Sequence, residues 1–258
     1  MSARHLVLAG LLPMMASAGL MLQARAADMV QTILAVKPAV VAIATSQKLR
    51  SPAVVFFGTG FVVGDGLTVV TNAHVVAPQM DSEKNGSLGV LTGSGQTPEF
   101  RGARVAAIDR EHDLAILKID GAPLPPLQLA GREVVEGQLV AFTGFPLGMV
   151  LGFHHATHRA MVSAITPVLQ PAISSQGLDT KTIAQLQRSA YHIIQLDGTA
   201  YPGNSGSPVY EPTSGLVYGI INMVYVKGLK ESAISQPSGI TYAIPSVFIR
   251  DLLATLKN

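Results

Sequence analysis

The chain of 258 residues contains no cysteine. Disulfide bonds, a thiol nucleophile and a metal site built on thiolates are therefore excluded. A lipid anchor on an N-terminal cysteine is excluded for the same reason. The fold must be stabilised by its packed core alone, although exported proteins are usually free to form disulfides.

Charged residues are also scarce, at 13% of the chain, while 48% of the residues are hydrophobic. A chain with this balance can bury a sizeable core and is not expected to be disordered. The formal net charge is +2, but Arg4 and Arg25 lie in the first 26 residues, which contain no acidic residue. Without that segment, 16 basic residues face 16 acidic ones, so the charge gives no indication of a nucleic-acid partner.

The first 26 residues have the pattern of an export signal. A positive residue, Arg4, precedes an apolar run over residues 6–22, and Ala24-Arg25-Ala26 forms a small-x-small cleavage site. The alternative is a membrane anchor, because the apolar run is nearly long enough to span a bilayer. Pro13 and the cleavage site favour removal, so we predict a signal peptide over residues 1–26 and a periplasmic or secreted mature protein.

Glycine (25) and proline (16) are plentiful, which is typical of many short strands joined by turns. The clearest hairpin is "FVVGDGLTVVT", where Gly64-Asp65-Gly66 joins two β-branched runs. Apolar runs of strand length follow, among them "DLAILKID", "LVAFTGFP" and "GLVYGIINMVYV". A Pro- and Gly-rich passage near the middle separates them into two halves, so we predict an all-β protein with domains over residues 27–126 and 127–258.

Short helices are expected at both ends of the mature chain. The first covers residues 28–37, places Val30, Ile33 and Leu34 on one side, and is ended by Pro38. The second is expected near the C-terminus with Ser246 as its N-cap, because apolar residues recur there at i, i+3, i+4 and i+7: Ile249, Leu252, Leu253 and Leu256.

The stretch "YPGNSGSPVY" surrounds Ser205 with turn residues. A serine hydroxyl is a weak nucleophile at neutral pH, so catalysis requires an adjacent base, an acid that orients the base, and N–H donors for the developing oxyanion. Gly203 lets the backbone turn so that its own N–H and that of Ser205 point into one hole. A lone serine in a Gly-rich turn is more often structural, so the interpretation depends on the base and the acid.

The base and the acid have candidates upstream of the serine. His74 lies in "TNAHVV", directly after the clearest hairpin, and Asp113 stands where the apolar run "LAILKI" begins. A half-buried carboxylate there needs a partner, and an imidazole N–H is a suitable one. The order His74, Asp113, Ser205 is that of chymotrypsin-like enzymes, not of subtilisins or α/β-hydrolases. The hydrolase motif G-x-S-x-G is also absent, because residue 207 is serine.

Four motifs in the order "TNAHVV", "HDLAILKI", "PGNSGSP" and "GITYAIPSVFIRDLL" resemble the HtrA/Deg family of trypsin-like serine peptidases, over residues 28–256. The resemblance implies two perpendicular antiparallel Greek-key β-barrels with the active site in the cleft between them. It implies His74 as the base, Asp113 as the orienting acid and Ser205 as the nucleophile. It also implies an oxyanion hole formed by the N–H groups of Gly203, Asn204 and Ser205.

The same resemblance implies polypeptide substrates and a possible homotrimer, with no cofactor and no metal. The sequence corresponds to the protease domain without the peptide-binding PDZ module that commonly follows it in the family. The strand "GLVYGIINMV" resembles the wall of the specificity pocket. The substrate-binding residues expected on this basis are Thr199, Ala200, Ile221, Asn222 and Met223.

None of these residues is acidic, so a basic P1 side chain would enter the pocket with its charge unpaired. We therefore expect a preference for small to medium aliphatic P1 residues. The family often carries a branched apolar residue at the position of Ala200, so the pocket is expected to be somewhat roomier here. "FHHATHR" holds three histidines, His154, His155 and His158, which we interpret as part of a solvated loop in preference to a metal site.

Two classes of function remain. The first is an exported serine endopeptidase that hydrolyses unfolded or misfolded proteins through an acyl-enzyme. The second is a trypsin-like binding or scaffold module whose catalytic groups are latent or unused. Retention of all three catalytic side chains favours the enzyme, and labelling by a fluorophosphonate probe would separate the two classes.

Overall fold

The computed structural model describes residues 29–79, 86–93, 95, 98–148, 152–168, 191–222 and 239–257. The predicted signal peptide and Met223 lie outside the described residues. Over the ranges that are described, no helix is both long enough and apolar enough to cross a membrane.

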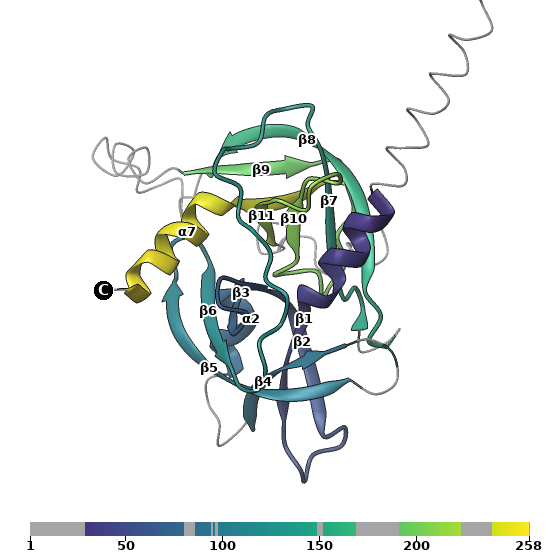
Figure 1. Cartoon of the computed structure of the whole chain (residues 1–258), viewed down its shortest axis with the longest axis vertical. Helices are drawn as coiled ribbons and strands as arrows, with labels where there is room; N and C mark the ends of the chain where they lie inside the picture. The colour runs from purple at the N-terminus through teal and green to yellow at the C-terminus, as the bar shows by residue number, and fades with distance from the viewer. Residues whose placement is uncertain are drawn as a thin grey trace, which may run out of the picture.

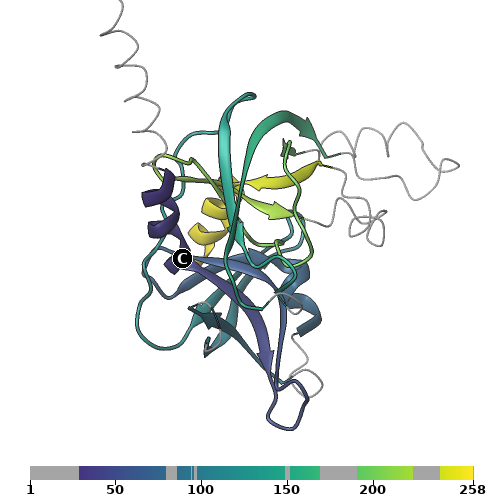
Figure 2. The same ribbon diagram turned by 90° about the vertical axis from the view of Figure 1, so that its right-hand side faces the viewer.

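In the described ranges, twelve strands form two closed antiparallel barrels, stacked one above the other (Figures 1 and 2). The first barrel has the strand order β1-β2-β3-β6-β5-β4 and the second the order β10-β11-β12-β9-β8-β7. The strands of the first barrel are β1 (Val40–Ser46), β2 (Val54–Val63), β3 (Thr68–Asn72), β4 (Ser87–Thr92), β5 (Glu99–Asp109) and β6 (Leu114–Ile119). Those of the second are β7 (Leu139–Gly144), β8 (Ala156–Pro167), β9 (His192–Leu196), β10 (Pro208–Tyr210), β11 (Val217–Asn222) and β12 (Thr241–Pro245). The predicted all-β fold of two barrels is confirmed.

The β2–β3 hairpin forms where the sequence predicts it. Phe61 pairs with Val70, and the turn between the strands has positive φ at Gly64 (62°) and Gly66 (78°), where glycine carries no steric penalty. The carboxylate of Asp65 accepts hydrogen bonds from the Leu67 N–H at 3.0 Å and from the Thr68 hydroxyl at 2.7 Å. The hairpin is therefore closed by its own turn residues.

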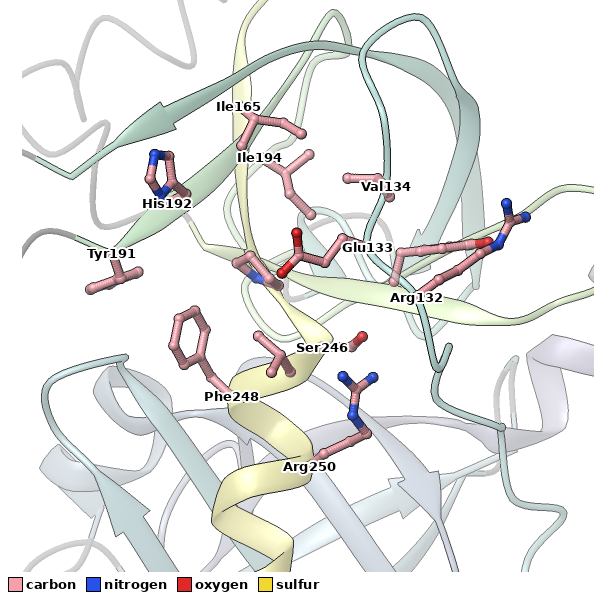
Figure 3. Close-up of a pocket in the computed structure, with 13 residues that line it drawn as sticks. Arg132, Glu133, Val134, Ile165, Tyr191, His192, Ile194, Ser246, Phe248 and Arg250 are labelled. Atoms are coloured by element: carbon pink, nitrogen blue, oxygen red, sulfur yellow. The ribbon is translucent and has the colours of Figure 1, made fainter.

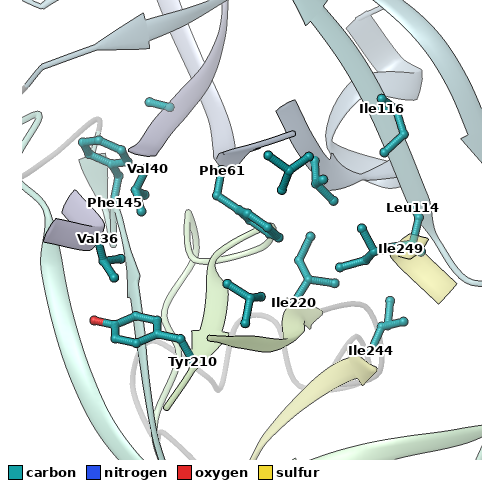
Figure 4. Packing of buried hydrophobic residues seen from close by; sticks show 14 of the residues in the cluster. Val36, Val40, Phe61, Leu114, Ile116, Phe145, Tyr210, Ile220, Ile244 and Ile249 are labelled. Carbon is teal, nitrogen blue, oxygen red and sulfur yellow. The ribbon is translucent and has the colours of Figure 1, made fainter. Parts of the chain in front are cut away.

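Each barrel has a core of its own, and a third cluster packs the two barrels together. Figure 4 shows that Phe61 and Leu114 of the first barrel meet Tyr210 and Ile220 of the second. Each of these four side chains is fully buried. Burying an apolar side chain of this size is worth about 1.5–3 kcal/mol, so this shared cluster fixes the relative position of the barrels and of the site between them.

The segment between β6 and β7 runs along both barrels. The Leu127 N–H donates to Val62 O at 2.8 Å in the first barrel, and the Ala130 N–H donates to Val217 O at 2.8 Å in the second. The predicted domain boundary after residue 126 falls within this segment, although the division itself stays a prediction.

The N-terminal helix covers residues 29–36 and continues as a 3₁₀ turn, η1 (Lys37–Ala39). Its predicted apolar side is not the buried one, since Val30 is 56% and Leu34 is 60% exposed. The buried positions are Thr32 and Val36, which pack against the barrels in place of the residues that the sequence pattern favoured.

The C-terminal helix α7 (Ser246–Ala254) buries Ile249 and Leu252, as predicted. Ser246 is the first helical residue and not the N-cap, so that part of the prediction is wrong. The N-cap position is Pro245, the last residue of β12, because the strand leads straight into the helix without a connecting residue. A 3₁₀ turn, η4 (Thr255–Lys257), follows and leaves Leu256 39% exposed.

Candidate active site between the barrels

His74 lies on a four-residue helix, α2 (Ala73–Val76), which begins directly after β3. Its ring faces Asp113, with Nδ1 2.5 Å from Oδ2 of the carboxylate, and its backbone N–H donates to Oδ1 at 2.8 Å. A carboxylate against Nδ1 favours the tautomer that carries its proton there. Nε2 is then free to accept a proton from a neighbouring hydroxyl.

The backbone of Asp113 is held in an uncommon conformation. Its φ is +52°, a left-handed value that non-glycine residues adopt rarely. The carbonyl of Asp113 accepts hydrogen bonds from the Ala73 N–H at 3.0 Å and from the Asn72 amide at 3.1 Å. The end of β3 and the start of α2 therefore fix both the backbone and the carboxylate of Asp113 relative to His74.

Asn222, at the end of β11 in the second barrel, contacts the His74–Asp113 pair. Its amide Nδ2 donates to Asp113 Oδ2 at 2.8 Å. The sequence predicts Asn222 among the substrate-binding residues and contains no signal for this contact, because the two residues are 109 positions apart. The structure places the side chain on the carboxylate that orients His74.

Ser205 lies in the loop of residues 201–207, which leads into β10. Two carbonyls of this loop accept N–H groups from within it: Tyr201 O from Asn204 and Asn204 O from Ser207, each at 2.9 Å. Pro202 O accepts the Leu147 N–H at 2.8 Å. These bonds fix the peptide planes 201–202, 202–203 and 204–205, all on the N-terminal side of the serine.

The first barrel holds the two remaining carbonyls. Ser205 O accepts the N–H of Thr59 on β2 at 2.8 Å, and Gly203 O accepts the hydroxyl of the same threonine at 2.7 Å. All five carbonyls from residue 201 to residue 205 are therefore bonded, three by the preceding contacts and two by Thr59.

The pattern of N–H groups in the loop is different. In the described part of the chain, the N–H groups of Gly203 and Ser205 have no hydrogen-bond acceptor, whereas that of Asn204 donates to Tyr201 O. This removes Asn204 from the predicted set of oxyanion donors, because its N–H closes the turn. Two alternate donors remain, which is the arrangement that an oxyanion hole requires.

The glycines of the motif are required by this geometry. Gly203 has φ +102°, and a Cβ there would lie 2.3 Å from Phe145 O. Gly206 has φ +92°, and a Cβ there would lie 1.8 Å from Thr59 O. Any other residue at either position would push the loop away from the neighbouring backbone.

The loop and the His74–Asp113 pair are joined through β11. The Gly206 N–H donates to Ile221 O at 3.0 Å, and the Ile221 N–H donates to Ser207 O at 2.9 Å. The next residue of β11 is Asn222, which bonds Asp113. Among the described residues the Ser205 hydroxyl makes no hydrogen bond to His74. The two residues are instead connected through the backbone of β11 and the side chains of Asn222 and Asp113.

The predicted specificity residues lie close to the loop. Ala200 is 8% exposed and Ile221 is fully buried, and both belong to the core cluster of the second barrel. The Ala200 N–H donates to the hydroxyl of Thr241 at 2.9 Å. Thr199 is half-buried, while Met223 lies outside the described residues. The role of these residues in binding stays a prediction.

The three clustered histidines do not form one solvated loop. His154 is exposed, but the ring of His155 packs 4.4 Å from that of Phe145 and its Nε2 lies 2.9 Å from Val40 O. His158 stacks on Phe142 at 4.9 Å. Burial lowers the pKa of both His155 and His158 below 6.5. No cluster of three potential metal-binding side chains occurs among the residues that the structure describes.

A separate cavity of about 410 Å³ lies between the start of α7 and the second barrel (Figure 3). Ile165, Ile194 and Phe248 line it together with charged residues such as Arg132 and Glu133. Neither His74, Asp113 nor Ser205 contributes to its wall. The cavity is therefore distinct from the site described above.

The family model of the trypsin-like peptidase domain matches residues 58–220, a span that contains His74, Asp113 and Ser205. The chain belongs to this family. The resemblance found in the motifs is thus confirmed at the level of the trypsin-like peptidase, and the curated relatives of this peptidase are of the DegP and HtrA type.

One relative is a probable periplasmic serine endoprotease, DegP-like, from Halomonas elongata, with 29% identity over 203 residues, 78% of this chain and 35% of that protein. Another is the serine protease HTRA1A of Danio rerio, with 30% identity over 233 residues, 88% of this chain and 40% of that protein. The chain therefore spans 35% and 40% of the length of these two relatives.

Solved structures share the fold. The active form of the Rv3671c protease from M. tuberculosis has a TM-score of 0.62 at 24% identity, covering 87% of this chain and 83% of that one. The serine endoprotease from Yersinia pestis has a TM-score of 0.61 at 22% identity, covering 88% of this chain and 66% of that one. At these identities the likeness establishes the two-barrel trypsin-like fold.

Proposed function

We propose that this chain is an exported serine endopeptidase that cleaves polypeptides through an acyl-enzyme formed on Ser205. The observation that carries the proposal is the loop of residues 201–207, in which the N–H groups of Gly203 and of Ser205 itself have no acceptor among the described residues. This arrangement suits a carbonyl oxygen that gains negative charge as the hydroxyl attacks it. A loop that served only as a turn would have no need to leave these two donors without acceptors.

The proposed roles follow from the contacts. His74 Nε2 takes the proton of Ser205 during attack and returns it to the leaving amine, while Asp113 holds the tautomer and stabilises the imidazolium. Asn222 donates its amide to Oδ2 of Asp113, the same carboxylate oxygen that bonds the His74 ring. Because this hydrogen bond comes from the second barrel, it also keeps the orienting acid in register with the barrel that carries the nucleophile.

Unfolded or misfolded proteins are the proposed substrates, with a preference for small to medium aliphatic P1 residues. The support is the apolar character of Ala200 and Ile221 and the absence of an acidic residue at the predicted pocket positions. The periplasm is the proposed location, supported by the leader-like residues 1–26 and by the names of the DegP-like relatives. A homotrimer is proposed from the family resemblance alone.

The alternative is a binding module with unused catalytic groups. Labelling of the purified mature chain by a fluorophosphonate probe decides between the two, together with cleavage of unfolded casein. The Ser205→Ala variant is expected to lose labelling and at least about 10⁴-fold of the cleavage rate, because the three side chains act as a unit.

The matched control for this experiment is Ser214→Ala, which alters an exposed serine whose hydroxyl bonds Glu211 at 2.6 Å, and it is expected to behave as the wild type. Undiminished cleavage by Ser205→Ala, or a folded wild type that neither labels nor cleaves, would reject the peptidase in favour of the binding module.

A further inference from the structure

We propose that Thr59 is the positioning residue for the oxyanion donors of the nucleophile loop. This inference rests on the proposed peptidase function and adds to it a residue on the opposite barrel. Thr59 lies in the middle of β2 in the first barrel and is fully buried. It forms two hydrogen bonds to a loop that lies about 145 positions further along the chain.

The hydroxyl of Thr59 has a defined direction. It accepts the Phe145 N–H at 3.1 Å, and a backbone N–H can only donate. Its single proton is therefore available for Gly203 O, which lies 2.7 Å away. The result is a one-way chain of hydrogen bonds from Phe145 N–H through the Thr59 hydroxyl to the carbonyl of Gly203.

This series of hydrogen bonds fixes the peptide plane between Gly203 and Asn204. The C=O and N–H of a trans peptide point in opposite directions. Here the C=O is bound by Thr59 and the N–H donates to Tyr201 O at 2.9 Å, so the plane is held at both ends. A change in ψ of Gly203 or φ of Asn204 that the other angle does not compensate would alter the relative directions of the two free N–H groups, and the bonds at both ends of this plane resist such a change.

Glycine makes this control necessary. Gly203 has no Cβ to restrict its backbone and already adopts φ +102°. The preference for one orientation of the following peptide must therefore come from outside the loop. The buried hydroxyl of Thr59 supplies this preference, because any other orientation would leave Gly203 O without its hydrogen-bond donor. A side chain at position 203 could not supply it, because a Cβ there would lie 2.3 Å from Phe145 O.

The backbone of Thr59 is itself held firmly. Its carbonyl accepts the hydroxyl of Thr71 on β3 at 2.7 Å, and its N–H donates to Ser205 O at 2.8 Å. The N–H of Thr59 thus fixes the carbonyl of Ser205 itself, and its hydroxyl fixes the carbonyl of Gly203, two residues earlier. One strand residue of the first barrel thus brackets Ser205 on both sides.

The test compares Thr59→Val, which removes the hydroxyl and keeps the shape, with Thr59→Ser, which keeps the hydroxyl. For Thr59→Val we expect kcat for a peptide substrate to fall by about tenfold to a hundredfold, because donors that stabilise the transition state lose their alignment. KM should change by less than about twofold, since ground-state binding does not use the hole. Thr59→Ser should recover most of kcat.

Two further measurements separate positioning from simple stabilisation. Affinity for a peptide boronate, whose tetrahedral adduct places an oxygen in the hole, should fall in Thr59→Val in parallel with kcat. The control is Thr143→Val, which removes a buried hydroxyl that bonds Tyr210 at 2.7 Å in the second barrel. This control should lower the melting temperature without lowering kcat or boronate affinity.

If Thr59→Val does not fold, Thr59→Ser and Thr59→Cys give the same comparison, because the serine keeps a strong hydroxyl donor and the slightly larger cysteine has only a weak thiol donor. The inference is overturned if Thr59→Val, or Thr59→Cys in its place, keeps the kcat of wild type. It is also overturned if kcat falls as far in Thr59→Ser as in the variant without the hydroxyl. Failure of the wild type to react with either the probe or the boronate would instead reject the proposed function.

Discussion

At the scale of single residues, the site depends on side chains that each hold more than one partner. Asp113 accepts from the N–H and ring of His74 and from the amide of Asn222, while it keeps a left-handed φ of +52°. Backbone strain of this kind costs on the order of 1–3 kcal/mol and persists only when surrounding contacts compensate for it. The five hydrogen bonds around Asp113 provide that compensation.

Ala200 is the residue through which substrate preference can be tested. Its side chain is buried beside Ile221 and carries no charge, so desolvating a lysine or arginine at P1 would cost on the order of several kcal/mol. Burial of an aliphatic P1 side chain gains roughly 1–3 kcal/mol. We expect a peptide library to show Val, Ala, Leu or Met at P1 in the wild type, and Ala200→Ile to shift the preference toward the smaller of these.

A dominant Arg or Lys at P1 would mean that the pocket is assigned to the wrong residues. An unchanged profile in Ala200→Ile would mean that position 200 does not face the bound side chain. Thr68→Val, a substitution at the first residue of β3 beside the β2–β3 turn, provides a variant in which the profile should not move.

At the scale of elements, the segment that leads into β8 ties the second barrel to the first. His155 precedes β8, and its Nε2 lies 2.9 Å from the carbonyl of Val40 on β1. Its ring packs on Phe145, which in turn contacts Phe56 of β2 and Phe153. The imidazole therefore lies in an apolar contact between the barrels, close to the carbonyl of Phe145 that abuts Gly203.

This contact predicts a pH dependence of stability. Burial lowers the pKa of His155 below its unfolded value of 6.5, and the neighbouring Lys37 and His154 also lower it, against the hydrogen bond to Val40 O, which raises it. The unfolded chain therefore takes up a proton first as the pH falls, so stability is complete above about pH 6.5 and declines below it. Burial of His158 acts in the same direction.

We expect the melting temperature to fall between pH 7.5 and pH 5, and His155→Gln, which keeps an N–H donor, to reduce that slope. The carboxylates with lowered pKa, Asp65 and Asp109, lose their stabilising effect only at lower pH and do not enter this window. His192→Gln, at an exposed position, is the control. A slope in His155→Gln equal to that of wild type would show that this imidazole carries the same charge in the folded and the unfolded state over this pH range, against the prediction.

The elements differ in how far the sequence determines them. The strands could be predicted, because β-branched runs between Gly and Pro turns leave few alternatives, as the β2–β3 hairpin shows. The short helix α2 and the buried side of residues 29–36 could not, since four residues give no periodicity and the side that packs is chosen by the barrels. The contacts of Asn222 and Thr59 depend on which strands of different barrels become neighbours, and nothing in the local sequence encodes that.

At the scale of the whole molecule, the proposed catalytic groups are divided between the barrels. The first carries His74, Asp113 and Thr59, and the second carries Ser205 and Asn222. The shared apolar cluster of Figure 4 holds them together. Loss of packing between the barrels should therefore abolish activity before either barrel unfolds.

Export is a property of the whole chain and has its own test. Arg4, the apolar run and Ala24-Arg25-Ala26 predict cleavage by signal peptidase before Ala27, because the run is followed by a small-x-small site. We expect mass spectrometry of the protein from its native compartment to give Ala27 as the N-terminus. Replacement of Ala26 by a bulky residue, Ala26→Phe, should cause the precursor to accumulate.

Detection of Met1 or Ser2 on the native protein would favour an uncleaved membrane anchor. Recovery of the full-length chain from the cytosol would reject export altogether. Cleavage of the Ala26→Phe variant at the same position would show that the site lies elsewhere.

The division of the site between the barrels has a consequence for how the protein is made. The chain leaves the ribosome with its N-terminus first, so His74 and Thr59 are synthesised more than a hundred residues before Ser205. A nascent chain in which only the first barrel has folded contains no complete active site. The proposed peptidase should therefore be unable to digest itself or neighbouring proteins until its second barrel has packed against Thr59.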